Sequence, residues 1–216
     1  MVQHFIKQFK TDITSIPWVE RYGGLARPIS QVSTNKDGQT FIKKYPVSCE
    51  INSEQCFKKG RYLDLVPDEK YKSLVYWEQT GIVGMTPVQK MPEAYDLYEF
   101  RAPMQLVVWL NLLKLGFTGC DSEHIFAGHI FKVLAKASRK NMTSPYKIEQ
   151  VTFTPKGILD NAAKVFAGYT YEDKQVLMMY PFAAFALRYE LVWRAFINCL
   201  PEAEINSPIS CLDLTI

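Results

Sequence analysis

The side chains that could carry acid–base, nucleophilic or metal chemistry are few and far apart in this sequence. The 216 residues include three histidines, His4, His124 and His129, and five cysteines. His124 and His129 are five positions apart, so on a helix they diverge by about 140° and cannot share a metal ion as histidines four apart can. The cysteines are odd in number and never form a C-x-x-C pair, which argues against a zinc site or a disulfide framework. We expect reduced thiols, no metal and no other cofactor.

One arrangement would permit covalent catalysis. Cys120 precedes His124 by four residues and lies near the expected start of a helix, where the pKa of a thiol can be lowered. A small cytoplasmic enzyme with Cys120 as nucleophile, assisted by His124 or His129, is therefore one hypothesis. A thiol without a catalytic role is the more common use of such a position. Because the sequence also lacks a nucleophile elbow, a metalloprotease motif, a dinucleotide fingerprint and a P-loop, we favour a protein that is not an enzyme.

Positive charge is concentrated on one expected helix rather than spread over the chain. Lysine and arginine number 25 against 22 acidic residues, a net charge of +3 that is too small to indicate a nucleic-acid binder by bulk electrostatics. Within the segment 123–140, however, Lys132, Lys136, Arg139 and Lys140 recur at helical spacing. We favour a solvated face whose cations complement the helix C-terminus. The alternative is a basic stripe that binds phosphates, which would make this a nucleic-acid-binding protein.

Aromatic residues gather near the front of the chain, in the segment 16–28 with the sequence IPWVERYGGLARP. Trp18, Tyr22 and Arg27 belong to residue types that are enriched in the hot spots of protein interfaces. We favour an aromatic plug beneath a loop of the same chain. The alternative is a contact surface, for which these three residues are our candidates for contacts between subunits.

The distribution of apolar, glycine and proline residues divides the chain into three expected parts. Residues 1–28 are predicted to form an N-terminal docking arm, residues 29–200 a single domain, and residues 201–216 a polar C-terminal tail. Glycines and prolines break the pattern within 81–93, which predicts a loop available for contacts.

The densest run of large apolar residues lies within 179–200, MYPFAAFALRYELVWRAFINCL. As a strand, it places apolar side chains on one face and Arg188, Glu190, Arg194 and Asn198 together on the other. As a helix over 181–200, it would turn Arg188 onto the apolar side, far from the other polar residues. We therefore favour a strand and keep the helix as the alternative.

The remaining pattern predicts an α+β fold, a mainly antiparallel sheet with one or two helices packed on it. The expected elements are a hairpin of 29–34 and 39–47, a strand at 71–80, two strands or one bent strand within 95–115, a helix at 123–140, a strand at 146–154 and a short helix at 159–167 capped by Asp160. The longer helix should pack on the sheet through Phe126, Ile130 and Val133.

The sequence contains no predicted targeting or membrane segment. Polar residues interrupt every apolar run of the N-terminal MVQHFIKQFKTDI, and no stretch reaches the roughly 18 apolar residues that a membrane span requires. We expect a protein made in the cytoplasm that makes no contact with a membrane.

Three phrases of the chain together resemble a known family. They are PWVERYGGLARP at 17–28, LVVWLN at 106–111 and MMYPFAAFALRYEL at 178–191. In combination they resemble the neck and tail-barrel ring proteins of short-tailed phages, especially crAss-like phages. More loosely, the last 120 or so residues are similar to the tail-terminator and tail-completion family, in which a helix packs on a sheet.

This resemblance implies a structural protein of the virion, made in the host cytoplasm. Such a protein would assemble with copies of itself, commonly six or twelve, into a ring that links the portal to the tail. Its partners would be neighbouring portal, neck or tail proteins, and genomic DNA would pass through the ring without sequence-specific binding. Rings require head-to-tail interfaces between two different surfaces of each subunit.

Overall fold

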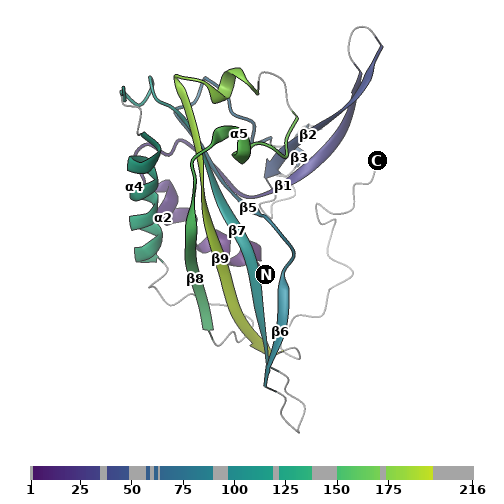
Figure 1. Ribbon diagram of the computed structural model, residues 1–216, viewed down its shortest axis with the longest axis vertical. Helices are drawn as coiled ribbons and strands as arrows, with labels where there is room; N and C mark the ends of the chain where they lie inside the picture. The colour runs from purple at the N-terminus through teal and green to yellow at the C-terminus, as the bar shows by residue number, and fades with distance from the viewer. Residues whose placement is uncertain are drawn as a thin grey trace.

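The computed structural model describes residues 2–34, 38–48, 57–58, 61–62, 64–89, 97–118, 122–137, 150–170 and 174–196. They form a seven-stranded, mostly antiparallel sheet with helices packed on its two faces (Figure 1), which confirms the predicted α+β class. The strands follow the order β2-β1-β5-β7-β9-β8, and β6 pairs with β7 beyond the end of β5. Their bounds are β1 Arg21–Thr34, β2 Thr40–Ser48, β5 Ser73–Gln79, β6 Gly84–Gln89, β7 Leu97–Asn111, β8 Gln150–Leu159 and β9 Phe182–Phe196.

The helices are short apart from one. They are α1 Val2–Gln8, α2 Lys10–Thr14, α4 Ser122–Ala137, α5 Ala162–Val165 and the 3-10 helix η1 Val176–Met178. Two very short strands, β3 (Phe57–Lys58) and β4 (Arg61–Tyr62), pair with each other outside the main sheet. Within the described part of the chain, no helix has the length and apolar character needed to cross a membrane.

The run at 179–200 contributes the strand β9, which confirms the strand prediction and excludes the helix. Every odd-numbered side chain from Phe185 to Ala195 is buried, while Arg188, Glu190 and Arg194 lie on the opposite face. β9 pairs with β7 along its whole length and with β8 on its other side. The alternation of apolar and polar residues was therefore sufficient to predict both the element and its faces.

The segment predicted as two strands or one bent strand is a single strand, β7, that continues through Pro103. The carbonyl oxygen of Pro103 accepts a hydrogen bond from the backbone N–H of Thr80 at 2.9 Å. In a strand, the N–H and C=O of one residue point to the same side, so the missing N–H of Pro103 faces the junction where β5 ends and β6 begins. No hydrogen bond to β9 is lost there, which explains why proline is tolerated in a central strand.

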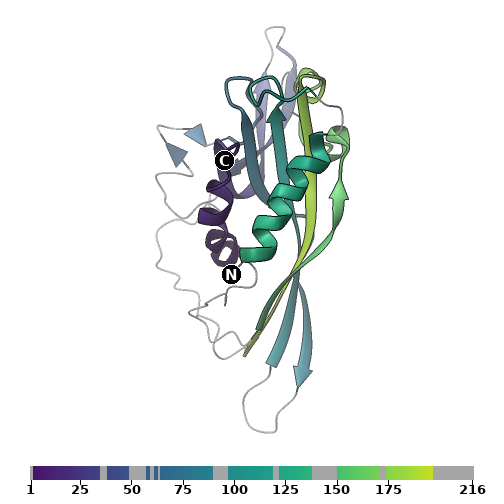
Figure 2. The same cartoon turned by 90° about the vertical axis from the view of Figure 1, so that its left-hand side faces the viewer.

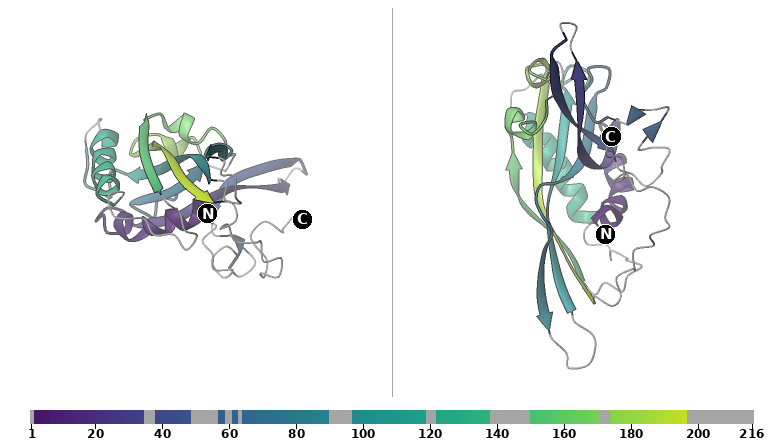
Figure 3. Two further views of the ribbon diagram at one scale, coloured as in Figure 1. Left: turned by 90° about the horizontal axis from the view of Figure 1, so that it is seen from below. Right: turned by 90° about the vertical axis from the view of Figure 1, so that its right-hand side faces the viewer.

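Two apolar clusters cover the two faces of the sheet. On one face, α1, α2 and α4 pack over the strands (Figure 2), and the core includes Phe5, Phe9, Trp77, Phe126 and Trp193. On the other face, α5 and η1 cover only the end of the sheet where β9 begins (Figure 1), and the view from below shows them on the side of the sheet away from α1 and α2 (Figure 3). The rest of that second face carries polar side chains.

The predicted docking arm at 1–28 is corrected by the structure, because its first half belongs to the core. Phe5, Ile6, Phe9 and Ile13 are each at most 1% exposed. Their spacing places them on one side of α1 and α2, and burying such a face is what stabilises helices this short. The second half of the segment enters the sheet as β1, which pairs in parallel with β5 from Arg21 onward.

Three further predictions are refined. The contact loop at 81–93 contains the strand β6, and its residues beyond Gln89 lie outside the described part. The strand predicted to end at Thr154 continues to Leu159 through a bulge at Lys156. The short helix is capped by Asn161, whose side chain accepts from the N–H of Lys164 at 3.0 Å, and not by Asp160.

Candidate assembly surfaces

Two of the three predicted contact residues are not at the surface. Trp18 is 9% exposed, its ring meets Phe126 edge-on at a centroid distance of 5.0 Å, and its indole N–H donates to Nδ1 of His129 at 3.4 Å. Tyr22 is partly buried against the same core. Only Arg27 is exposed. The indole of Trp18 therefore packs within the chain against Phe126 and His129, under helix α4 and not under the predicted loop.

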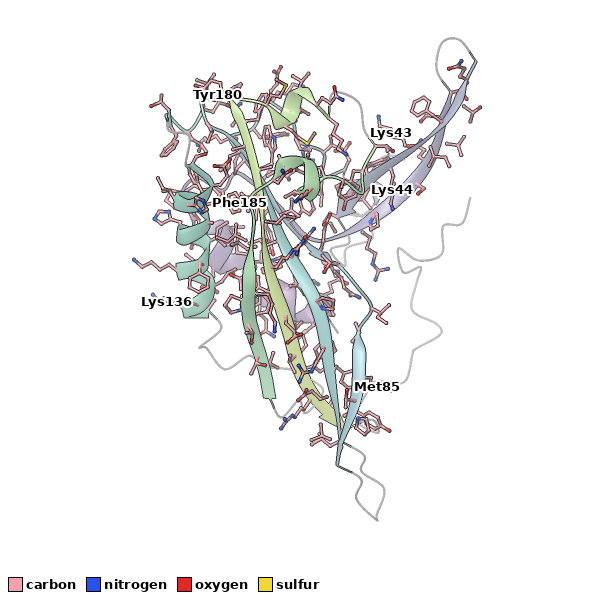
Figure 4. All side chains as sticks on the ribbon, viewed as in Figure 1. Lys43, Lys44, Met85, Lys136, Tyr180 and Phe185 are labelled. Atoms are coloured by element: carbon pink, nitrogen blue, oxygen red, sulfur yellow. The ribbon has the colours of Figure 1, made fainter. Side chains whose placement is uncertain are left out.

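The predicted basic stripe is only partly described. Lys132 and Lys136 are exposed on α4, and Lys136 projects away from the sheet (Figure 4). Arg139 and Lys140 lie outside the described residues. The two described lysines match a solvated helix face.

The hypothesis of a cysteine nucleophile falls largely outside the described part of the chain. The cysteines are Cys49, Cys56, Cys120, Cys199 and Cys211, none of which is described. His124 is exposed on α4, and His129 accepts the indole N–H of Trp18. Among the residues that are described, no three His, Cys, Asp or Glu side chains lie close enough together to hold a metal ion.

The first surface with unusual exposure is the distal part of the β1–β2 hairpin, residues 27–34 and 40–45. β1 pairs with β5 only as far as Ala26, so beyond that point the hairpin has two strands and projects from the body (Figure 1). Val32 and Ile42 sit directly opposite each other and are 68% and 63% exposed. Thr170 ties this part of β2 to the body, since its N–H donates to the carbonyl oxygen of Lys44 at 2.7 Å and its hydroxyl donates to the carbonyl oxygen of Ile42 at 3.0 Å. The tip beyond Ile42 is a two-stranded hairpin, which is marginally stable in water, so a covering partner would stabilise it.

The second such surface is β6 with the residues just before it. Ile82 is 89% exposed and Met85 is 56% exposed (Figure 4). Residues 80–89 contain no charged side chain. Natural edge strands are usually protected by charges, because an uncharged edge pairs readily with another chain. β6 lies at the opposite end of the sheet from the β1–β2 hairpin (Figure 1).

The third surface is a polar groove on the open half of the second sheet face. Its volume is about 240 Å³, and it is lined by Glu99, Arg101, Thr152, Thr154, Glu190, Val192 and Arg194. Glu99 accepts from Arg101 at 2.6 Å through one oxygen and from Arg194 at 3.1 Å through the other. Glu190 in turn accepts from Lys156 at 3.1 Å and lies 3.6 Å from Arg101. These hydrogen bonds lower the pKa of Glu99, Arg101 making the larger contribution.

Two carboxylates of the groove, Glu99 and Glu190, therefore cross-link its two arginines and the neighbouring Lys156. Each arginine has its planar guanidinium fixed by Glu99, which limits the freedom of the side chains on this face. Such a network can keep an extended part of a sheet in one shape and present a weakly positive surface. It contains no nucleophile with an adjacent base.

A buried acid at the border of the second core cluster was not predicted from the sequence. Glu78 of β5 is 9% exposed and accepts hydrogen bonds from the hydroxyl of Tyr169 and from Nε2 of Gln105, the latter at 2.5 Å. Burial raises the pKa of Glu78, and the two hydrogen bonds counteract only part of that effect. The residue follows directly on Tyr76 and Trp77 in a strand buried on both faces, so its place next to this apolar run is the signal that could have indicated a buried carboxylate.

Comparison with known proteins adds no functional assignment to this geometry. No protein-family model matches the sequence, and no curated protein matches it either.

Proposed function

We propose that this chain is a structural subunit that assembles with copies of itself into a ring in the neck or tail of a phage particle, coaxial with the channel through which DNA passes. Its neighbours in the particle would be portal, neck or tail proteins. The chain would then act by its shape and contacts and not by catalysis.

The observation that carries the proposal is the pair of apolar surfaces at opposite ends of one sheet. Val32 and Ile42 are exposed on the β1–β2 hairpin, and Ile82 and Met85 are exposed at β6. Apolar side chains gathered on projecting segments mark sites of protein contact. Because the two surfaces differ in sequence and shape, they support head-to-tail association, which closes into a ring when the rotation between copies allows it.

The polar groove is compatible with a DNA channel. Its ion-paired cluster has one more cation than carboxylate, since Arg101, Arg194 and Lys156 face Glu99 and Glu190. A surface that is weakly positive does not repel DNA, and cations already paired with carboxylates do not bind phosphates strongly enough to retain it. A groove turned toward the channel would therefore let DNA slide.

The test is self-association of the full chain, measured by light scattering coupled to size-exclusion chromatography. The double variant Val32→Ser and Ile42→Ser should shift the wild-type oligomer toward the monomer, because the hairpin loses its apolar pair. Ile125→Ser is the matched control, since Ile125 is 57% exposed on α4, which is far along the chain from both the β1–β2 hairpin and β6.

Both variants should keep the circular dichroism spectrum of the wild type. An oligomer that the hairpin variant leaves intact, or that the Ile125 control disrupts equally, would contradict a role for the hairpin in assembly.

A further inference from the structure

We propose that copies of the chain join edge to edge, β6 of one copy against β8 of the next, so that one antiparallel sheet continues across the ring. This inference rests on the proposed self-assembly and adds a junction between β6 and β8, which is separate from the contact expected at the β1–β2 hairpin. The partner is a second copy of this chain.

Both strands are edges of the same part of the sheet. Gly84 of β6 pairs with Arg101 of β7, Arg101 pairs with Val192 of β9, and Val192 pairs with Thr152 of β8. These four residues form one row across four strands, β6-β7-β9-β8. Among the described strands, none pairs with the outer side of β6 or of β8. The two open edges therefore lie at the same level of the sheet, as the lower half of Figure 1 shows.

The directions of the two edge strands suit a continuous sheet. β6 is antiparallel to β7, β7 to β9, and β9 to β8. Three reversals leave β6 antiparallel to β8. When a second copy is placed beside the first in the same orientation, its β8 therefore runs antiparallel to β6. Antiparallel strands pair directly without any connecting segment, and every junction between copies would have the same geometry.

The two faces of the sheet also continue across such a junction. One row contains Met85, Phe100, Trp193 and Val151, all apolar, and the next contains Thr86, Glu99, Arg194 and Gln150, all polar. Both edges thus carry the same alternation, with apolar residues facing the α1 side and polar residues facing the groove. Pairing β6 with β8 places apolar beside apolar and polar beside polar.

The backbone groups needed for pairing point outward on both edges. The C=O of Pro103 points toward β5 and β6, and so do the backbone groups of Arg101 and Glu99, because the direction alternates along β7. Their partners Gly84 and Thr86 therefore point inward toward β7. Met85 and Pro87, which alternate with them, direct their backbone groups away from β7. On the other side of β7, Trp193 of β9 points toward Phe100, so Val192 points toward β8 and its partner Thr152 points back toward β9. Val151 and Phe153, on either side of Thr152, therefore direct their backbone groups away from β9.

A register that matches these groups places Met85 opposite Phe153 and Pro87 opposite Val151. Thr86 then faces Thr152, and paired threonines stabilise a sheet. In this register only the hydrogen bond that Pro87 cannot donate is missing.

The open part of β8 has a definite end that agrees with the short length of β6. Beyond Thr154 the edge is interrupted by Pro155 and by the bulge at Lys156, whose Nζ pairs with Glu190 at 3.1 Å. A proline, a bulge and a lysine together protect this part of the edge from pairing. β6 has a proline and a bulge as well, between Pro87 and Gln89, so its part without such a device is Gly84 to Thr86. The portion of β8 without such protection is Gln150 to Thr154, which lies at the level of β6.

The direct test is a disulfide across the proposed junction. Thr86→Cys and Thr152→Cys are introduced together in a chain whose five native cysteines are serine. The two positions face each other without mutual backbone hydrogen bonds, where Cα atoms lie about 4.5 Å apart and a disulfide fits. Mild oxidation should give a ladder of covalent multimers. The control pairs Thr86→Cys with Ile125→Cys, because Ile125 lies on α4, and it should give no ladder.

A second variant avoids the cysteine-free background. Met85→Pro removes an outward N–H while leaving the bonds to β7 intact, and Met85→Leu is its matched control. Light scattering should show that Met85→Pro raises the midpoint concentration of assembly by about tenfold, since one interface hydrogen bond is lost and the neighbouring backbone is restricted. Met85→Leu should assemble like the wild type.

The outcomes separate this inference from the proposed function. If the wild type forms a ring but the double-cysteine chain gives no ladder, or if Met85→Pro leaves the ring intact, the edge-to-edge junction is overturned while the ring assignment stands. A wild type that never associates overturns both. If the cysteine-free chain does not fold, the comparison of Met85→Pro with Met85→Leu decides alone.

Discussion

At the scale of single residues, Trp193 links the strand β9 to the helix α1. Its ring stacks on Phe100 at a centroid distance of 5.3 Å and lies 5.7 Å from Phe5, and the residue is 2% exposed. We predict that Trp193→Ala lowers the free energy of unfolding by about 3–5 kcal/mol, because it removes a large buried side chain and leaves a cavity. Urea denaturation followed by circular dichroism measures the change.

Tyr189→Phe is the control for that experiment on the same face of the same strand. The hydroxyl of Tyr189 is buried and has no hydrogen-bond partner among the described residues. Removing it should leave the free energy of unfolding unchanged or slightly higher, since an unsatisfied buried donor is lost. If both variants were equally destabilised, β9 would be sensitive to any change, and the specific role of Trp193 would be refuted.

We predict that the buried carboxyl group of Glu78 makes the free energy of unfolding depend on pH. Its pKa is raised by burial, so the folded state binds the proton more tightly than the unfolded state does. Glu78 should therefore favour folding increasingly as the pH falls from above its raised pKa toward its ordinary value of 4.5. Glu99 acts in the opposite sense, because its lowered pKa makes the fold less stable as it becomes protonated.

The variant Glu78→Gln isolates the effect of Glu78 from that of Glu99. Glutamine keeps an acceptor for Tyr169 but does not titrate. The difference in urea midpoint between the variant and the wild type should favour the variant at neutral pH and shrink as the pH falls toward 4.5. A difference that stays constant over this range would show that Glu78 is not buried as a charge in the folded chain.

Residue types and spacing predicted the faces of β9 well and the role of Trp18 poorly. In a strand, the alternation from Phe185 to Trp193 places the apolar side chains on one face and the polar ones on the other, and the sheet has one apolar and one polar side there. Trp and Arg are both residue types enriched in interface hot spots. Trp18 is nevertheless buried, whereas Arg27 is exposed. Only the packing of α4 beside Trp18 decides between the two, and α4 is more than a hundred residues away in the chain.

At the scale of elements, the N-terminal helices have the largest consequence for stability. Phe9 lies at the junction of α1 and α2, is 1% exposed, and has its ring 4.9 Å from Phe153 and 6.0 Å from Trp77. We predict that Phe9→Ala lowers the free energy of unfolding by about 3–5 kcal/mol. The exposed Lys7 provides the control, and Lys7→Ala should change stability by less than about 0.5 kcal/mol.

Near-equal stability of Phe9→Ala and the wild type would support a separable N-terminal arm.

The sequence does not predict α1 and α2 because polar residues interrupt the apolar ones at the N-terminus. A five- or seven-residue helix shows too few turns for its period to be recognised, and its stability comes from the sheet beneath it.

Strands with strong turn signals were predicted better than β6. The sequence Asn-Lys-Asp-Gly at 35–38 is a local turn signal between two β-rich segments. The hairpin expected at 29–34 and 39–47 is present as β1 and β2, which pair from Ala26 to Thr34 of β1. β6 contains Gly84 and Pro87, which normally indicate a loop. It is a strand because it lies at an edge, where a proline can direct its missing N–H away from the neighbouring strand. Edge position is a property of the sheet and could not be predicted from the segment alone.

At the scale of the whole molecule, helices cover the apolar parts of the sheet, while its described edges are open. α1, α2, α4 and α5 cover the two core clusters, while the β1–β2 hairpin, β6 and the lower part of β8 offer unpaired or apolar surface among the described residues. In the proposed assembly such a chain would gain further stability from copies of itself. The polar groove would then lie on a face that neighbouring copies leave open.

The central claim, assembly into a closed ring, is tested most directly by the mass of the native particle. Native mass spectrometry of the purified chain, alone and co-expressed with the adjacent virion proteins, should give one discrete oligomer whose mass is a whole multiple of 24.9 kDa. A single species of 24.9 kDa under both conditions at micromolar concentration, or an open series of masses with no closed state, would contradict it.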